Sequence, residues 1–398
     1  MKFRPFKNLL VALVLLMLTV LPARAADEDQ LGNPPLVWGK VIKIITQVKS
    51  DSKAAQDGLL TQTMLIKLTS GEFKGRVVKV TNTVGLNPAY DIKVREGDGV
   101  VVALNLQDGK ITSAGIADHL REPQIYFLIA IFVILLLLVG WSKGLKALVT
   151  LLFTLGLIMG LVLPGFLRGY NPIALTLALA MVVTVVNTLI VGGWSRKSAA
   201  SMIGTFGGLA IAGLIAFSIG KAANLTGFGT EEASMLLYLP KNVHLNIQGL
   251  LFAGIIIGAL GAVMDVSMSV ASAIEEVHRV SPGLTMRELF RCGMNVGRDI
   301  MGIMANTLIL AYTGSSITLL LIFMAYQDSI TLIMNLDLIA SEIVRALSGS
   351  IGMIMVVPLT AAVAGLLFGN RSQESQPPAD DNPAEEKEYS YWDDWGKK

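Results

Sequence analysis

Residues 125–141 read IYFLIAIFVILLLLVGW, a run without a single charged side chain. A helix needs about 20 apolar residues to cross the hydrocarbon of a bilayer, so this run is close to membrane-spanning length. Further apolar runs follow at 147–167, 173–193, 199–219, 247–273, 301–325 and 349–369. We therefore predict an α-helical polytopic membrane protein, with about seven transmembrane helices in a transmembrane domain at 123–369.

The composition of the chain supports a membrane protein. Of its 398 residues, 53% are hydrophobic and 16% are charged, whereas soluble domains carry about 25% charged residues. The 32 basic and 30 acidic residues leave a net charge of +2, without the basic surplus typical of nucleic-acid binding. We expect the lipid bilayer as a partner and no nucleic acid. Cys292 is the single cysteine, which excludes an internal disulfide and a cysteine-built metal centre.

The N-terminus has the parts of a secretory signal peptide. A basic start, MKFRPFK, precedes an apolar run at 9–21 that is short for a membrane anchor. Ala23–Ala25 then forms a small-x-small cleavage site, which predicts a signal peptide at 1–25. An uncleaved signal anchor is the alternative. Both interpretations place the following segment outside the cytoplasm.

Residues 26–122 have a different character and predict a small all-β extracytoplasmic domain. They contain no apolar run of membrane length, and short β-rich stretches alternate with Gly, Asn, Asp and Pro turns. The predicted strands are 37–48, 63–69, 76–80, 91–94 and 99–106. Such spacing is typical of a small barrel or sandwich.

The distribution of basic residues predicts the orientation of the chain. With 26–122 outside, nine basic residues fall on the cytoplasmic side and four on the outer side, in agreement with the positive-inside rule. The inner set is Lys143, Lys146, Arg196, Lys197, Arg279, Arg287, Arg291, Arg298 and Arg371, and the outer set is Arg168, Lys221, Lys241 and Arg345. Residues 370–398 then form a disordered acidic cytoplasmic tail. An amphipathic pattern at about 335–347 predicts a helix that lies in the outer interface, or a re-entrant piece packed on the bundle.

Asp265 is the one carboxylate deep inside a predicted span. A charged side chain at mid-helix costs about 2.5–3.5 kcal/mol on insertion scales, so it marks a functional site or needs a partner. We predict a polar cavity between the fifth and sixth spans in which Asp265 binds a cation or a proton. Ser269, Asn306 and Asn187 would supply oxygen ligands there. The structural alternative is a buried network in which Asp265 pairs with Asn306 or Arg298.

A second polar group lies where the sixth span begins. Asn295, Asp299 and Asn306 share one helical face. Asn295, Arg298 and Asp299 are predicted at the cytoplasmic end of this span. These three residues are therefore candidates for the cytoplasmic entrance of a path to the deep carboxylate.

Catalytic chemistry is not expected. Intramembrane aspartyl proteolysis needs two facing carboxylates, and only Asp265 is deep. His119, His244 and His278 lie outside the predicted spans, so no zinc site and no Ser–His pair is predicted within the membrane. No P-loop pattern is present either. We expect no enzyme activity, no cofactor and no metal centre.

Two blocks of sequence resemble a known family. AVMDVSMS at 262–269 and GMNVGRDIMGIMANTLILAYTGSS at 293–316 are similar to the YibE/F family of bacterial multi-pass membrane proteins. The similarity spans most of residues 120–370, and the export signal and outer domain look like those of the YibE-like members. The resemblance implies an integral membrane protein of permease-like type, without a defined reaction. The matching residues of this chain are Asp265, Asn295, Arg298, Asp299 and Asn306.

Two functions follow as hypotheses. The first is a permease or transporter-like protein with a cation- or proton-linked polar site, acting on an unknown small solute or ion. The second is a membrane-anchored receptor or scaffold that binds through the outer β domain. The predicted spans do not divide into two equal repeats, so a homo-oligomer or a second family member could complete the assembly.

Overall fold

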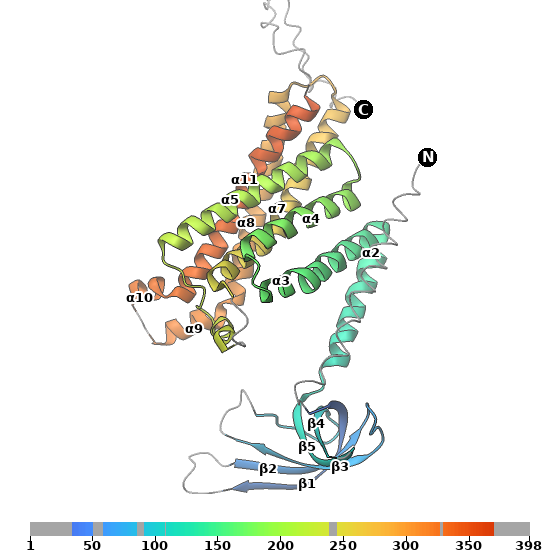
Figure 1. Cartoon of the computed structure of the whole chain (residues 1–398). Coiled ribbons are helices and arrows are strands. Elements are labelled where there is room, and N and C mark those ends of the chain that lie inside the picture. The colour runs from blue at the N-terminus through green and yellow to red at the C-terminus, as the bar shows by residue number, and fades with distance from the viewer. Residues whose placement is uncertain are drawn as a thin grey trace, which may run out of the picture. The chain divides into compact units, whose positions relative to one another are not determined.

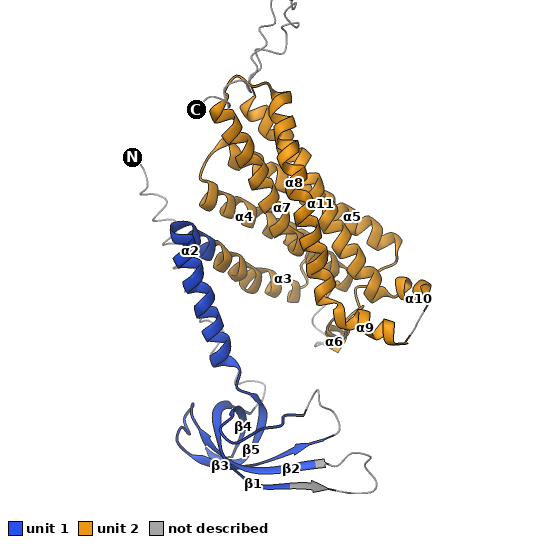
Figure 2. Cartoon of the chain, turned by 180° about the vertical axis from the view of Figure 1, so that it is seen from behind, with its two compact units in different colours: residues 1–149 blue, residues 150–398 orange. Residues whose placement is uncertain are grey.

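The structure, a computed structural model, describes residues 34–50, 59–85, 91–107, 109–238, 245–326 and 329–369. Figure 2 shows the chain as two compact units, residues 1–149 and residues 150–398. The predicted signal peptide at 1–25 and the predicted tail at 370–398 lie outside the described residues.

The first unit contains a five-stranded antiparallel sheet (Figure 1). Its strands are β1 (Leu36–Ser50), β2 (Leu59–Leu68), β3 (Val77–Val84), β4 (Gly99–Gln107) and β5 (Lys110–His119). They are ordered β3-β2-β1-β4-β5, and the sheet curls until β3 approaches β5. This near-barrel confirms the predicted small all-β domain.

The core of the near-barrel follows from alternation along its strands. Val100, Val102 and Leu104 of β4 are fully buried, and the residues between them are partly exposed. A period of two is the signature of a pleated strand with one buried face. Gly39 of β1 lies against this core, where an added Cβ would stand 2.5 Å from Ile66 Cγ2. The close approach of β1 to its neighbours therefore requires glycine at this position.

The prediction of a strand at 91–94 is wrong, and β5 was not predicted. Side chains bond the carbonyl groups of that segment: Asn82 Nδ2 donates to Ile92 O (2.7 Å), and Gln62 Nε2 donates to Val94 O (3.3 Å). A sheet ladder is therefore not needed to satisfy them. β5 reads KITSAGIADH, in which Gly and Ala weaken the strand signal, and its pairing with β4 decides its conformation.

The remaining described elements are helical. They are α2 (Glu122–Leu157), the π-helical segment η2 (Ile158–Val162), α3 (Leu163–Leu167), α4 (Pro172–Gly192), α5 (Arg196–Ala222), α6 (Glu231–Met235), the 3₁₀ segment η3 (Leu236–Tyr238), α7 (Ile247–Val280), α8 (Met286–Ser315), α9 (Ile317–Tyr326), α10 (Ile330–Asn335) and α11 (Asp337–Phe368). Side-chain oxygens of Asn171, Ser195 and Asn246 cap the first turns of α4, α5 and α7. These caps explain where the three helices begin.

Five helices among the described residues are long and apolar enough to cross a membrane, and α8 with α9 adds a sixth if that pair, bent by 62°, is one span. The difference from the seven predicted spans lies in Glu122–Leu167, a helical stretch of 46 residues. Its path breaks at Trp141, whose φ of 48° and ψ of −127° are not helical. Just beyond the break, an added Cβ on Gly144 would stand 2.1 Å from Leu136 O. The stretch therefore consists of two helical pieces, separated close to the gap between the first two predicted spans.

In the second unit, α7 packs against α4, α5, α8 and α11. The pairing of α5 with α11 depends on small residues, because an added Cβ on Gly208 would stand 3.0 Å from Gly352 O. Close backbone approach at glycine is typical of helix pairs in membranes. The long apolar helices and their small-residue contacts confirm the predicted polytopic helical fold.

The amphipathic segment predicted at 335–347 is helical but forms no separate element among the described helices, so its placement in the interface is wrong and the alternative, packing on the bundle, is the one observed. α11 is continuous from Asp337 to Phe368 and contains both most of this segment and the last predicted span. The polar face of the segment turns into the second unit: Ser341 is 5% exposed, and the side chains of Glu342 and Arg345 are partly buried. Contacts with neighbouring helices therefore replace the water that an interfacial helix would face.

Candidate functional site

Asp265 lies midway along α7 and is exposed on the surface of the second unit. Gly261, one turn earlier, and Ser269, one turn later, are exposed on the same side. The shared face follows from helix geometry, in which residues three and four apart are neighbours. Within the described chain, the Asp265 carboxyl group forms no hydrogen bond or ion pair.

The predicted site residues of α8 also face away from the helices that α8 packs against. They are Asn295, Arg298, Asp299 and Asn306, and all four are exposed. Gly297 forms part of the contact face, where an added Cβ would stand 2.1 Å from Val357 Cγ1. Asp299 follows Gly297 by two positions, which is about 200° around the helix. Tight glycine packing on one side therefore turns the polar face outward.

The buried network proposed as the structural alternative is wrong, because Asp265, Asn306 and Arg298 are all exposed. The same exposure means that α7 and α8 present an open polar surface at these positions, where an enclosed cavity was predicted. What remains of the prediction is that both helices carry polar groups on exposed faces.

α7 and α8 are nonetheless antiparallel neighbours. Gly293 of α8 packs on Ile274, and Gly258 of α7 packs on Tyr312 Oη. This register places Asp265 level with the middle of α8. Asp265 and the polar residues of α8 thus lie at neighbouring levels of one helix pair.

Two predicted entrance residues line a groove along the first half of α8. The groove has a volume of about 540 Å³ and includes Asn295 and Arg298 but not Asp299. Its other lining residues are Met286, Arg287, Phe290, Arg291, Met294 and Ala362. Three arginine side chains interleaved with apolar ones make a surface that attracts anionic groups.

A buried polar seam between α5, α7 and α11 was not predicted. Ser267 Oγ donates to Ser201 O (2.8 Å) and lies 2.8 Å from Thr360 Oγ1. The Ser267 hydroxyl has a single proton, which it donates to the Ser201 carbonyl. Thr360 Oγ1 is therefore the donor in its bond to Ser267 Oγ. The signal available in the sequence was the spacing of hydroxyls by four residues, as in Ser201 and Thr205.

Asn187 is the predicted site residue of α4, and no hydrogen bond links it to this seam in the described part of the chain. It is half-buried on α4, and its Oδ1 atom is buried without a partner among the described residues. Further buried hydroxyls without a partner there are those of Thr176, Thr184, Thr188, Ser201 and Thr205. Buried polar atoms usually have a hydrogen-bond partner, so this group of unsatisfied atoms is unusual.

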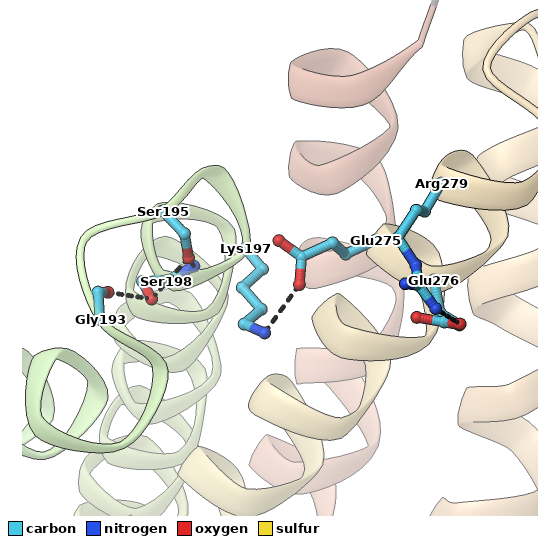
Figure 3. A network of polar contacts seen from close by, with 7 residues as sticks. All are labelled: Gly193, Ser195, Lys197, Ser198, Glu275, Glu276 and Arg279. Carbon is cyan, nitrogen blue, oxygen red and sulfur yellow. Dashed lines mark hydrogen bonds and ion pairs between the residues drawn. The ribbon is translucent and has the colours of Figure 1, made fainter. Parts of the chain in front are cut away.

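An ion pair and a cap join the helix ends beside the seam (Figure 3). Lys197 Nζ of α5 lies 2.7 Å from Glu275 Oε2 of α7, and both side chains are partly buried. Ser198 Oγ donates to Gly193 O (2.7 Å), which holds the turn between α4 and α5. The contact between Lys197 and Glu275 therefore fixes the start of α5 against the last third of α7.

Comparison with protein families gives two matches. Residues 128–370 match the family described as YibE/F-like protein, and residues 37–119 match the YibE/F family N-terminal domain. No curated protein and no solved structure matches the chain. The first match contains both sequence blocks around Asp265 and Asn306, and the second covers the near-barrel. With its long apolar helices and a family match over more than half of its length, the chain is a multi-pass membrane protein that belongs to the YibE/F family.

Proposed function

We propose that this protein is a permease in which Asp265 binds a cation or a proton during transport of a small solute or ion. The observation that carries the proposal is the position of this carboxyl group, midway along a 34-residue apolar helix and without a partner in the described chain. A carboxylate held in hydrocarbon costs about 2.5–3.5 kcal/mol. Binding a cation or a proton would remove that cost.

The surface around Asp265 leaves room for a ligand. Gly254 and Gly261 lie on the same side of α7, and nothing lies within 4 Å of a Cβ added at either residue. Ser269 adds a hydroxyl oxygen one turn away on the exposed face. A carboxylate with a nearby hydroxyl and open space is a donor set suited to a hard cation or a proton.

The buried polar seam supports a moving α7. Hydroxyls of α4 and α5 are buried without a partner in the described chain, so a shift of α7 that supplies partners to them would break none of their hydrogen bonds. Transport requires two arrangements of the same helices around a site. The Lys197–Glu275 pair would then act as a fixed point during such a shift.

The orientation proposed for the chain places the near-barrel outside and the C-terminal tail in the cytoplasm. The excess of basic residues in the predicted cytoplasmic loops supports it. One crossing before Trp141 and one after it would raise the number of membrane crossings to seven. An odd number of crossings puts the near-barrel and the C-terminal tail on opposite sides of the membrane.

The test is a ligand screen on purified protein in detergent, with Asp265→Asn beside wild type. The ligands are Na⁺, K⁺, Mg²⁺, Mn²⁺ and Zn²⁺, together with a pH series. A ligand at 100 times its Kd stabilises by about 2.7 kcal/mol, which thermal unfolding resolves. Glu276→Gln is the matched control, because it makes the same change on an exposed residue of α7. We expect one ion or pH step to stabilise wild type and Glu276→Gln but not Asp265→Asn.

Flux into proteoliposomes with that ion then separates transport from binding alone. Asp265→Asn should abolish the flux while expression and unfolding temperature remain close to wild type. Full flux in this variant would contradict the role given to Asp265.

A receptor or scaffold role is the second candidate, and one observation favours it. β1 exposes Leu36, Trp38, Ile42 and Ile45, and large apolar side chains on a sheet surface are typical of binding sites. Under this proposal, deleting 26–120 removes function, whereas Asp265→Asn affects only stability. A fully active chain without the near-barrel would exclude it.

A further inference from the structure

A second site lies where α7 and α11 begin, in a cavity of about 180 Å³. We call it the α6–α11 cavity. Its polar lining is Thr230, Ser341, Glu342 and Arg345, and its apolar lining includes Ile247 and Leu250 of α7. One water molecule needs roughly 10–15 Å³, so the cavity has room for a small molecule.

The loop before α6 is held in place over the cavity. Thr226 donates to the Asp337 carboxylate from its backbone nitrogen (3.2 Å) and from Oγ1 (2.6 Å). Gln248 Nε2 donates to Leu225 O (2.7 Å), which ties the same loop to α7. Gly227 has φ of 83° and lies close to Ile247 O, so the turn requires glycine. The roof of the cavity is therefore built by specific contacts.

Two buried polar groups of α11 in this lining have no partner in the described chain. Ser341 is 5% exposed, and its Oγ atom is unsatisfied. Arg345 Nε is also buried and unsatisfied, while Nη2 of the same guanidinium lies 3.4 Å from Glu342 Oε1. Both unsatisfied groups can donate a hydrogen bond, and the side chains that carry them line the cavity, so a side-chain rotation would bring each donor to an acceptor placed there.

The start of α11 adds positive potential. Its N-cap residue, Leu336, supplies no side-chain hydrogen bond. The first turn of a helix carries unpaired N–H groups and the positive end of the macrodipole. Asp337 offsets part of this potential, but its carboxylate is engaged by Thr226 and it does not line the cavity. An anion in the cavity would meet two donors and one helix start, against the single carboxylate of Glu342, which Arg345 partly neutralises.

We propose that the α6–α11 cavity binds a small oxyanion, a carboxylate or a phosphate group, through Ser341 and Arg345. A guanidinium and a hydroxyl are the donors that suit such oxygens, and charge-assisted bonds of this kind are the stronger ones. The Glu342–Arg345 contact is long for a charged pair, which leaves the guanidinium able to turn toward the ligand. The oxyanion can be a free solute or the phosphate of a lipid headgroup.

The site does not depend on the transport proposal. Ile247, which lines the cavity, is 18 positions from Asp265, about 27 Å along the helix. An oxyanion could bind there whether or not Asp265 takes a cation.

The experiment uses full-length protein in detergent, titrated separately with sodium acetate, sodium phosphate and dihexanoyl phosphatidic acid. Sodium chloride keeps the ionic strength constant, and the shift of the unfolding temperature reports binding. We expect at least one of the three to stabilise wild type saturably. Stabilisation by acetate or inorganic phosphate identifies a free solute, and stabilisation by phosphatidic acid alone identifies a lipid headgroup.

Three variants make the result specific. Ser341→Ala removes an unsatisfied hydroxyl, so the fold should survive, and Arg345→Lys keeps the charge but loses Nε. Each should weaken binding about tenfold or more, the effect of one hydrogen bond to a charged group. Ser348→Ala is the matched control, because Ser348 is a buried serine of α11 outside the cavity, and it should bind like wild type. No stabilisation of wild type, or equal affinity in Ser341→Ala and Arg345→Lys, would overturn the proposal.

Discussion

Replacing Gly204 by alanine tests whether the buried polar seam holds α5 against α11. A Cβ added at Gly204 would stand 1.9 Å from Thr360 Oγ1 and 2.9 Å from Ser267 Oγ. Carbon and oxygen atoms normally approach no closer than about 3.3 Å. Thr360 must therefore rotate, which breaks its bond to Ser267, or the two helices must separate by about 1.4 Å.

The expected loss of stability follows from three terms. Overpacking of a well-packed contact costs about 1–3 kcal/mol, and the broken hydrogen bond costs about 0.5–1.5 kcal/mol. The helix propensity of alanine over glycine returns about 1 kcal/mol. Gly204→Ala should therefore lower the free energy of unfolding by about 2 kcal/mol.

The assay is equilibrium unfolding in mixed micelles, with Gly254→Ala as the control. Nothing lies within 4 Å of a Cβ added at Gly254, so this variant should be neutral or slightly more stable. Combining Gly204→Ala with Thr360→Ala removes the colliding oxygen, and the double variant should be about 1 kcal/mol more stable than the sum of the single effects. Wild-type stability in Gly204→Ala, or strictly additive effects, would refute this account of the seam.

Three further outcomes can be measured. Arg121 Nη1 donates to Asp118 Oδ2 (2.6 Å), which lowers the pKa of this exposed carboxyl below its usual 3.8. The Asp118–Arg121 pair therefore stabilises the folded near-barrel above about pH 4, and this stabilisation is lost as the pH falls further and the carboxylate takes up a proton. Resistance of the near-barrel to pepsin should consequently fall more steeply with pH in wild type than in Asp118→Asn. Glu275→Gln removes the 2.7 Å pair with Lys197 and should cost roughly 1 kcal/mol of unfolding free energy in the same micelle assay, an effect absent in a Lys197→Met background. Lys74→Cys, made in a variant in which Cys292 is replaced by serine, should react with an impermeant maleimide added to intact cells. Labelling only after lysis would show that the orientation is the reverse of the one proposed.

Hydropathy and family resemblance predicted the long-range architecture. Runs at 173–193, 199–219 and 247–273 correspond to α4, α5 and α7, because transfer into a bilayer is a property of the residues themselves. The β-rich stretch predicted at 99–106 between turn residues likewise corresponds to β4, in which each second residue from Val100 to Leu104 enters the core. The same reasoning failed at 91–94, where side-chain hydrogen bonds replaced a ladder.

Packing decided what the residue pattern left open. An amphipathic face at 335–347 has the same periodicity whether it meets water or other helices, and the start of α11 turned out to be packed against the second unit. On α8, the polar face around Asp299 was predicted to face a neighbouring helix. The structure instead places Gly297, on the opposite side of α8, against Val357 of α11.

The sequence alone determined that the chain is a membrane protein with a β domain before its helices, and that Asp265 is the one carboxylate within its long apolar runs. Transfer energies, strand periodicity and the family's sequence blocks suffice for these conclusions. Only the tertiary structure decided that Asp265 lies on an open face, that polar groups of α5, α7 and α11 form a buried seam, and that Ser341 and Arg345 line one cavity. Such contacts depend on which glycines allow two helices to approach, and that choice involves residues far apart in the chain.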